Sequence, residues 1–525
     1  MRTRTTVAGF VALIAIAGTA EAAETPKQGG TLTFAVGGEP PNYDCHANTS
    51  FAAIHPLAPH YSLLLKFDPA TYPNVVGDLA QSWEVTPDQL TFTFRLKPNV
   101  KFHDGSPLTS ADVKASYDRI RKPPPGVVSA RQAAFEDVTD IEAPDPGTVV
   151  FKLGKPNASM LANLASPWNC IYSAARLQAD PKWPEKNVMG SGPFKFVEHV
   201  KGSHWSGQRF DQYFDEGKPY LDGFRAVFMT GAAMINALQG GQVMTEFRGL
   251  TPAERDRLVQ ALGDKIKVEE GPWNCKLDVI YNVEKKPFDD VRVRRALSLA
   301  IDRWQGSEAL RKIAFVRDPG GIFRPGYEYA ADEATLTRLP GFGRDAAAAK
   351  REARKLLKEA KREKLKVTLT NRSVPMPYTP VALFVIDQWR QIGVEVEHQA
   401  LETSPYQAAL SSGNYEAGIT FTCDYMDEPN VQLLNYLSAD VSSLNYGRYK
   451  DRKLDQLFET QKRMTDKAER MKTVRQFESH LLEQAYVAPV IWYWRIVAYY
   501  KEMKGWQITP SHYLNQDLAG VWLDR

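Results

Sequence analysis

The sequence predicts an α/β protein with more than one lobe. Short segments in which apolar and polar residues alternate are spread along the chain, and longer segments with apolar residues every three or four positions lie between them. The first spacing is typical of strands and the second of helices, and their mixture indicates the α/β class. At 525 residues, the chain is longer than one hydrophobic core usually organises.

Six segments have the alternation expected of strands. They cover residues 31–36, 91–96, 148–153, 224–229, 366–370 and 394–400. Each is short, and helical patterns separate several of them, as expected when strands and helices share one fold.

Five segments have the apolar spacing expected of helices: residues 109–121, 291–302, 345–364, 380–392 and 451–483. The first begins with Thr109 and has Asp112 in its first turn, which indicates a capped start. Asp289 and Asp290 precede the second, where carboxylates cap a helix and meet its positive end. Glutamates alternate with lysines and arginines in residues 345–364, so we expect a solvated helix with ion pairs rather than a basic binding patch.

The first residues have the three parts of a secretory signal. Arg2 and Arg4 are positive, residues 7–20 are apolar or small, and Ala20 and Ala22 provide the small residues that a signal peptidase reads. We predict that residues 1–22 are removed and that the protein works in the periplasm. In that oxidising compartment its four cysteines are able to pair.

Composition and motifs disfavour several functional classes. Lysine and arginine total 65 against 62 aspartates and glutamates, a net charge of +3, which argues against a nucleic-acid partner. The sequence has no zinc-protease, nucleotide-loop or hydrolase-elbow motif. His46, His55 and His60 match no usual metal-ligand spacing, and His103 with Asp104 fits a structural turn better than an acid–base pair. We therefore predict no enzyme, no metal site and no cofactor.

Several segments, taken in order, resemble the family 5 extracellular solute-binding proteins. They read GGTL at 29–32, LAQSWE at 79–84, FTFRL at 92–96, VKFHDG at 100–105, TSADV at 109–113, GSGPFKF at 190–196, PFDDVRVRRAL at 287–297 and GNYEA at 413–417. The resemblance covers residues 28–495. The family includes the dipeptide-, oligopeptide- and nickel-binding components of ABC importers.

The resemblance implies a two-lobed periplasmic binding protein of type II, cluster C, with a ligand cleft between the lobes. Lobe I would cover residues 23–275, with an extra subdomain at about 61–188, and residues 489–525 would return to it. Lobe II would cover residues 276–488, and the chain would cross near residues 277–282 and 486–492. The protein would be a monomer that delivers a small molecule to an ABC permease in the inner membrane.

The resemblance also implies ligand-binding residues. Asp424, in the segment TCDYMDEP at 422–429, matches the aspartate that receives the ammonium of a dipeptide in related proteins. Arg372, after the predicted strand 366–370, matches the arginine that receives the carboxylate. The chemistry fits, because an arginine offers a planar fork to a carboxylate and a buried aspartate accepts from an ammonium. Alternatively, Arg372 and Asp424 pair with each other or with nearby protein residues.

Three further residues are candidates for ligand contact. Glu402 stands where peptide binders often have an aromatic residue, and in the cleft it would prefer a cationic or hydroxyl-rich ligand; otherwise it is an acid at a helix start. Tyr425 follows Asp424 directly. Trp168 is a candidate aromatic wall, as are Trp273 and Tyr406, and core burial is the alternative for each.

The cysteine pairing also comes from the resemblance, because oligopeptide binders join cysteines in similar segments. It implies a bond between Cys275 and Cys423, which would brace the segment with Asp424. Cys45 and Cys170 are then left to pair with each other. The alternative is two or four free thiols.

Together these features predict a binding protein for a peptide or a peptide-like zwitterion, such as an opine. The alternatives are a binder of a sugar, an oligosaccharide or a metal chelate, and, in a different class, a secreted hydrolase.

Overall fold

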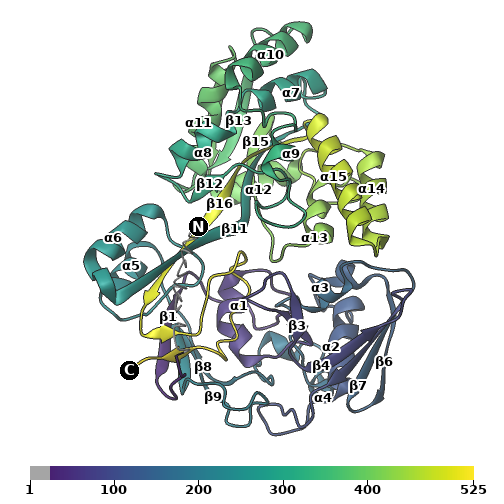
Figure 1. Cartoon of the computed structure of the whole chain (residues 1–525), viewed down its shortest axis with the longest axis vertical. Coiled ribbons are helices and arrows are strands. Elements are labelled where there is room, and N and C mark those ends of the chain that lie inside the picture. The colour runs from purple at the N-terminus through teal and green to yellow at the C-terminus, as the bar shows by residue number, and fades with distance from the viewer. Residues whose placement is uncertain (1–23) are drawn as a thin grey trace, which may run out of the picture.

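The computed structural model describes residues 24–525, so the predicted signal peptide lies outside the described residues. Two bodies make up the molecule, and a pair of long strands, β11 (Ile266–Tyr281) and β16 (Val487–Tyr500), runs between them (Figure 1). We call the body with two four-stranded sheets lobe I and the body with a six-stranded sheet lobe II. The predicted two-lobed α/β class is confirmed.

Lobe I contains the two four-stranded sheets. The first has the order β1 (Thr31–Val36), β10 (Gly223–Phe228), β9 (His204–Arg209) and β8 (Phe194–Val200), with only β1 and β10 parallel. The second has the order β4 (Ala80–Val85), β5 (Thr91–Leu96), β7 (Thr148–Leu153) and β6 (Val138–Asp145) and is antiparallel. Helix α2 (Ser110–Arg121) packs on the second sheet, which carries its own apolar core.

Lobe II is built around the six-stranded mixed sheet. Its order is β12 (Val316–Asp318), β16, β11, β15 (Ala417–Cys423), β13 (Lys366–Arg372) and β14 (Glu395–Leu401). One apolar core combines its strands with α7 (Val291–Leu299), α8 (Arg303–Leu310), α10 (Ala346–Glu359) and α11 (Tyr378–Arg390). Another includes residues of α12 (Thr403–Ser412), α14 (Arg452–Arg463) and α15 (Lys467–Glu483). Burial by both cores accounts for the apolar runs in β11, β15 and β16.

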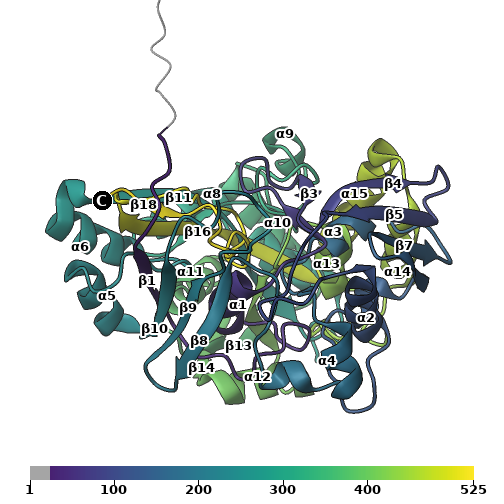
Figure 2. The same cartoon turned by 90° about the horizontal axis from the view of Figure 1, so that it is seen from below.

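The strands β11 and β16 connect the lobes. Their pairing shifts register between Pro272 and Lys276. Before that point β11 packs with α6 (Pro252–Leu262), next to α5 (Gly231–Gln239), and beyond it β11 pairs with β15 of lobe II. Seen from below, α5 and α6 lie at the opposite end of the molecule from β4–β7 (Figure 2). The predicted crossings fall within or next to these two strands, and the exact lobe boundaries stay a prediction.

Short elements complete the fold. They are α1 (Phe51–Leu57), α3 (Met160–Leu164), α4 (Ala174–Ala179), α9 (Glu333–Leu336), α13 (Pro429–Leu433), β2 (Leu65–Phe67), β3 (Val75–Gly77), β17 (Met503–Lys504) and β18 (Trp522–Leu523). The last two return to the core of lobe I. Across the described part of the chain, we find no helix with both the length and the apolarity needed to cross a membrane.

Helix starts follow the predicted caps. The side chain of Asp112 accepts from the backbone N–H of Thr109 at 2.8 Å, and Asp290 accepts from the N–H of Arg292 at 2.9 Å. The predicted helix 451–483 is divided, because Asp466 caps a new helix by accepting from the N–H of Glu469 at 2.9 Å. Likewise the helix predicted at 291–302 ends at Leu299, and Asp302 caps the following helix.

The glycines of the GSGP segment serve packing. A Cβ atom on Gly190 would lie 2.1 Å from the carbonyl oxygen of His60, and one on Gly192 would lie 2.5 Å from the His60 carbonyl carbon. Only a residue without a side chain fits that close backbone approach. Gly105 has a φ of 88°, in the structural turn favoured for His103 and Asp104.

Candidate functional site

One edge of the lobe II sheet faces lobe I. β13 runs parallel to β15, so both strands end at this edge. Met426, three residues after the end of β15, is buried in the core around β4–β7 of lobe I. Asp424 and Arg372 therefore lie where the two lobes meet, and ligands of α/β proteins commonly bind beyond the carboxyl ends of parallel strands.

A disulfide fixes the end of β15. Cys423 is bonded to Cys275 with an S–S distance of 2.11 Å, and the two residues are directly opposite in the pairing of β15 with β11. The N–H of Asp424 then donates to the carbonyl oxygen of Asn274 at 2.9 Å. The backbone that carries the Asp424 carboxylate is thus tied to the strand that joins the two lobes.

Asp424 lines a cavity of about 230 Å³. The cavity lies between β15 and the residues around 435–449 and includes Asp278, Thr420, Thr422, Tyr436 and Asn445 in its lining. Ile280, Phe421, Leu444 and Val487 also belong to the lining, so hydroxyl, amide and carboxylate groups alternate with apolar side chains around the space. Such a lining suits a small ligand that has both polar and apolar groups.

The pKa of Asp424 is raised to about 7, chiefly by burial; the charge of Lys276 opposes the rise, and the charges of Asp427 and Asp278 add to it. Lys276 is already committed, because its ammonium donates to Asp278 at 2.6 Å and to the hydroxyl of Tyr436 at 2.5 Å. Asp424 is therefore close to half ionised at neutral pH, and a ligand ammonium would stabilise its charged form.

Buried polar atoms without a hydrogen bond occur around this site. Within residues 24–525 they include both amide atoms of Gln432, the side-chain oxygen of Asn274 and the hydroxyl of Tyr493. The Gln432 side chain lies beside Asp424. Buried polar groups in native proteins are usually paired with protein, water or ligand, so these atoms have free capacity to bind.

Arg372 and Asp424 do not pair with each other. Among the described residues, neither side chain forms an ion pair; Arg372 instead donates to the hydroxyls of Thr403 at 2.8 Å and Tyr378 at 3.4 Å. Its guanidinium lies 5.4 Å from the ring centre of Tyr378. The group is half-buried and keeps N–H donors for an acid.

Glu402 is an exposed acid at the start of α12, where it occupies the cap position. Its carboxylate accepts from the Ser373 hydroxyl at 2.7 Å. This placement agrees with the helix-start alternative, and contact of Glu402 with a ligand stays a prediction.

Tyr425 and Trp168 belong to the lobe I side of the site. The Tyr425 ring packs partly buried against two cores of lobe I. Trp168 is only 1% exposed, with the Arg131 guanidinium 5.0 Å from its ring and the Tyr513 ring at 5.9 Å. Trp168 is therefore a buried neighbour of Tyr513, and its direct contact with a ligand stays a prediction.

Trp273 and Tyr406 are also buried. Trp273 donates from its indole N–H to His512 at 3.0 Å, and Tyr406 donates to the carbonyl oxygen of Ile419 at 2.6 Å. Both rings therefore have the core roles that were weighed as alternatives.

Residues that the sequence did not single out hold the Asp424 segment from both lobes. The hydroxyl of Tyr72, in lobe I, accepts from the N–H of Asp427 at 2.6 Å, and Arg324, in lobe II, pairs with the Asp427 carboxylate at 2.6 Å. Arg248 and Tyr513 reach the same region from lobe I: burial raises the pKa of Tyr513, Asp424 adds to the rise and Arg248 opposes it. No local motif marks any of these residues.

The histidines weighed as metal ligands have separate structural roles. His46, His55 and His60 each bind a different carbonyl oxygen, of Cys170, His512 and Phe194 respectively, at 2.7–3.0 Å. Burial lowers the pKa of each to about 3. The three imidazoles are thus neutral donors at separate points of lobe I. The residues that the structure describes hold no group of three side chains able to bind a metal.

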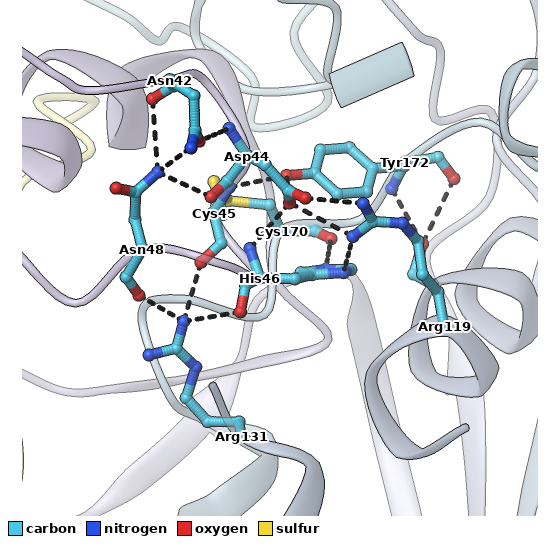
Figure 3. The surroundings of a disulfide bond; sticks show 10 residues. Asn42, Asp44, Cys45, His46, Asn48, Arg119, Arg131, Cys170 and Tyr172 are labelled. Atoms are coloured by element: carbon cyan, nitrogen blue, oxygen red, sulfur yellow. Dashed lines mark hydrogen bonds and ion pairs between the residues drawn. A yellow bond between two sulfur atoms is a disulfide. The ribbon is translucent and has the colours of Figure 1, made fainter. Parts of the chain in front are cut away.

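His46 lies beside the second disulfide, between Cys45 and Cys170, with an S–S distance of 2.10 Å (Figure 3). Arg119 donates to Asp44 at 2.5 Å, and both side chains are buried. Arg131 donates to the backbone carbonyls of Cys45 and His46 (Figure 3). Both predicted cysteine pairs are therefore present, and this one fixes the loop after β1.

A second cavity, of about 240 Å³, lies in lobe I beneath the C-terminal residues 513–520. Its charged lining is satisfied internally, because Lys66 pairs with Asp517 at 3.1 Å and with Asp78 at 3.4 Å. The cavity at Asp424 has the unpaired carboxylate and is the better candidate for a ligand.

Comparisons with known proteins agree with this geometry. Residues 74–443 match the family described as bacterial extracellular solute-binding proteins, family 5 Middle. The dipeptide-binding protein of Escherichia coli K12 is 27% identical over 512 residues, 92% of this chain and 93% of that protein. The di/tripeptide-binding protein 1 of Pseudomonas aeruginosa is 27% identical over 443 residues, 79% of this chain and 80% of that protein.

Solved structures support the fold. The substrate-binding protein CtaP of Listeria monocytogenes superposes with a TM-score of 0.83 at 23% identity, covering 95% of this chain and 100% of that one. The binding protein AgaA of A. tumefaciens R10, solved with agropinic acid, superposes with a TM-score of 0.77 at 24% identity, covering 94% and 99%. At these identities the likeness concerns the fold.

Proposed function

Because this chain belongs to family 5 of the bacterial extracellular solute-binding proteins, we propose that it captures a peptide or a peptide-like zwitterion between its lobes. It then delivers the ligand to the permease of an ABC importer in the inner membrane. Its relatives named as dipeptide- and di/tripeptide-binding proteins support this class of ligand.

One observation carries the proposal: Asp424, which forms no ion pair among the described residues, lines a cavity of lobe II, and the segment that carries it contacts lobe I through Asp427 and Tyr72. The ligand ammonium takes that carboxylate, and Arg372 takes an acid group with the N–H donors that Thr403 and Tyr378 leave free. Each charged hydrogen bond contributes about 1.5–3 kcal/mol. Contacts made only when both lobes are engaged favour the closed form.

The proposed function also includes a location in the periplasm and a division of the chain into two lobes. Residues 1–22 act as a signal peptide that is removed on export to the periplasm. Lobe I comprises residues 23–275 and 489–525, with its subdomain at about 61–188, and lobe II comprises residues 276–488. The protein acts as a monomer, and it binds its ligand without chemical conversion.

A thermal-shift screen tests the proposal. Ligand binding to the native state raises the melting temperature by mass action, and a ligand at 100 times its Kd adds about 2.7 kcal/mol. Dipeptides or opines are expected to shift the wild type, and Asp424→Asn is expected to lose the shift. A shift produced only by oligosaccharides or nickel chelates would overturn the peptide assignment, and turnover of the added compound would overturn a pure binding role.

A further inference from the structure

Arg248 lies on a short turn of lobe I that the surrounding chain holds rigidly. Both oxygens of the buried Glu246 accept backbone N–H groups, from Arg248 at 2.8 Å and from Gly249 at 2.7 Å. The buried Arg495, on β16, donates to the carbonyl oxygens of Arg248 at 2.9 Å and of Phe247. Two buried charged side chains thus fix the backbone from which the Arg248 side chain projects.

The Arg248 guanidinium itself is exposed and uncommitted. Among residues 24–525 it forms no ion pair and donates no side-chain hydrogen bond, and the nearby Glu246 uses its oxygens on backbone groups. The guanidinium lies over two aromatic rings, 4.7 Å from the ring centre of Phe51 and 6.0 Å from that of Trp273. Aromatic faces hold a guanidinium in place without using its N–H donors.

Side chains from both lobes lie around Arg248. The Trp273 ring, 6.0 Å from the Arg248 guanidinium, packs edge-on against Tyr493 of β16 at 5.8 Å. Burial raises the pKa values of Tyr493 and of Tyr378 in lobe II, and the charge of Arg248 opposes both rises. On the lobe I side, burial and then Arg248 lower the pKa of His512, which is therefore neutral. Arg248 thus lies near side chains of both lobes. The buried Glu246 is close enough for the Arg248 charge to act on its pKa, but both Glu246 oxygens are bound to backbone N–H groups.

Tyr378 connects Arg248 with Arg372. The Tyr378 hydroxyl accepts from Arg372 at 3.4 Å, and Arg248 is the other arginine whose charge acts on this tyrosine. Two guanidiniums, one from each lobe, therefore approach the same aromatic group. Nearby, Asp278 pairs with Lys276 and Asp427 pairs with Arg324, whereas Asp424 forms no ion pair among the described residues and is partly protonated at neutral pH.

From this arrangement we infer that Arg248 and Arg372 together receive two acid groups of the ligand, so that the protein selects a dicarboxylic zwitterion with a net negative charge. The inference rests on the proposed function and narrows it from zwitterions in general to those with one amine and two acids. Acidic dipeptides and N-carboxyalkyl amino acids are the chemical classes that fit. A ligand whose two acids are held by one arginine from each lobe also links the lobes, which favours closure.

Isothermal titration with matched acid and amide ligands tests the inference. The first pair is Ala-Glu and Ala-Gln, and the second is N-(carboxymethyl)alanine and its monoamide. Wild type is expected to bind each acid about 10- to 100-fold more tightly than its amide, the factor expected of one charged hydrogen-bonded contact. Arg248→Gln is expected to remove that preference. Arg351→Gln, an exposed arginine on α10, is the matched control and should keep it.

The outcomes separate this inference from the proposed function. If the dipeptides bind but acid and amide bind equally well, or if Arg248→Gln keeps the preference, the inference is overturned and the peptide-binding function stands. If N-(carboxymethyl)alanine binds and the dipeptides do not, and if that binding depends on Arg248, the inference stands. The proposed ligand is then an N-carboxyalkyl amino acid instead of a peptide. If none of the four compounds binds folded wild type, both are overturned. Circular dichroism of each variant confirms that it is folded.

Discussion

Cys275 and Cys423 are directly opposite each other on two neighbouring antiparallel strands, and the disulfide between them ends one residue before Asp424. The bridge therefore does two things at once. It closes a loop of 148 residues that contains most of lobe II, and it fixes the backbone of the carboxylate that we assign to the ligand ammonium. The second bridge, between Cys45 and Cys170, closes a loop of 125 residues within lobe I.

Removing the first bridge should therefore cost both stability and affinity. The double variant Cys275→Ser with Cys423→Ser is expected to lose about 2–4 kcal/mol of stability, the usual effect of opening a long disulfide loop. It should also bind amine-bearing ligands more weakly, because Asp424 loses its anchor. Melting temperature and titration calorimetry measure the two effects. Cys45→Ser with Cys170→Ser is the control, and a similar loss of affinity there would contradict a specific role for Cys275 and Cys423.

Affinity for an amine ligand should rise with pH. Since the pKa of Asp424 is about 7, the carboxyl is mostly protonated at pH 5.5 and accepts an ammonium only after losing its proton. Binding at pH 5.5 is expected to be about 15-fold weaker than at pH 7. Calorimetry at pH 7 in buffers with different ionisation enthalpies should detect proton release on binding. Asp424→Asn should abolish both the pH dependence and the proton release.

The same carboxyl affects the stability of the ligand-free protein. Its folded pKa, about 7, lies above the usual value of 3.8, so between those pH values the folded state holds a proton that the unfolded state has lost. The contribution of this carboxyl to the free energy of unfolding therefore falls as the pH rises from about 4 to 7. Comparing denaturant melts of wild type and Asp424→Asn at pH 4.5 and 7.5 isolates the contribution, and parallel changes in the two proteins would contradict it.

Local sequence was sufficient for most of the secondary structure. The strand at residues 91–96 and the helix at 109–121 have the expected bounds to within one residue, because alternation and capping are properties of neighbouring residues. The pattern at 451–483 was less informative: its apolar spacing continues through the break, but the Asp466 side chain satisfies the N–H of Glu469 and begins a new helix.

The site was predictable only where a family motif carried it. Asp424, Arg372 and the cysteine pairs came from resemblance, whereas Arg248 and Tyr513 were missed. Their surroundings depend on chain segments hundreds of residues apart: Arg248 is held by Arg495, and Tyr513 packs on Trp168. No periodicity or spacing encodes such contacts, since they arise only when the lobes and the C-terminal segment assemble.

Lys276 and Asp278 should tune Asp424 in opposite directions. Lys276 lowers the pKa of Asp424 and Asp278 raises it, although burial remains the largest cause of the shift. Lys276→Met should therefore move the midpoint of pH-dependent binding upward, and Asp278→Asn should move it downward. Each change also breaks a buried ion pair, at a cost of about 3–5 kcal/mol in stability, so binding is compared below the melting temperature of both variants. Midpoints that move in the same direction would contradict this electrostatic arrangement.

A hydrogen bond between the lobes should bias the protein toward closure. The hydroxyl of Ser159, in lobe I, donates to Glu428 of lobe II, while Arg470 pairs with Glu428 from within lobe II at 2.5 Å. Ser159→Ala removes two hydrogen bonds between the lobes, from Ser159 to Glu428 and from Arg470 to Ser159 at 3.0 Å, and leaves the Glu428–Arg470 pair in place. Since a hydrogen bond to a charged group contributes about 1.5–3 kcal/mol, ligand affinity should weaken about tenfold or more. Small-angle scattering of the ligand-free variant should show a larger radius of gyration. Ser411→Ala, which changes an exposed serine of lobe II, is the control. If Ser159→Ala matches that control in both measurements, the hydrogen bonds of Ser159 do not govern closure.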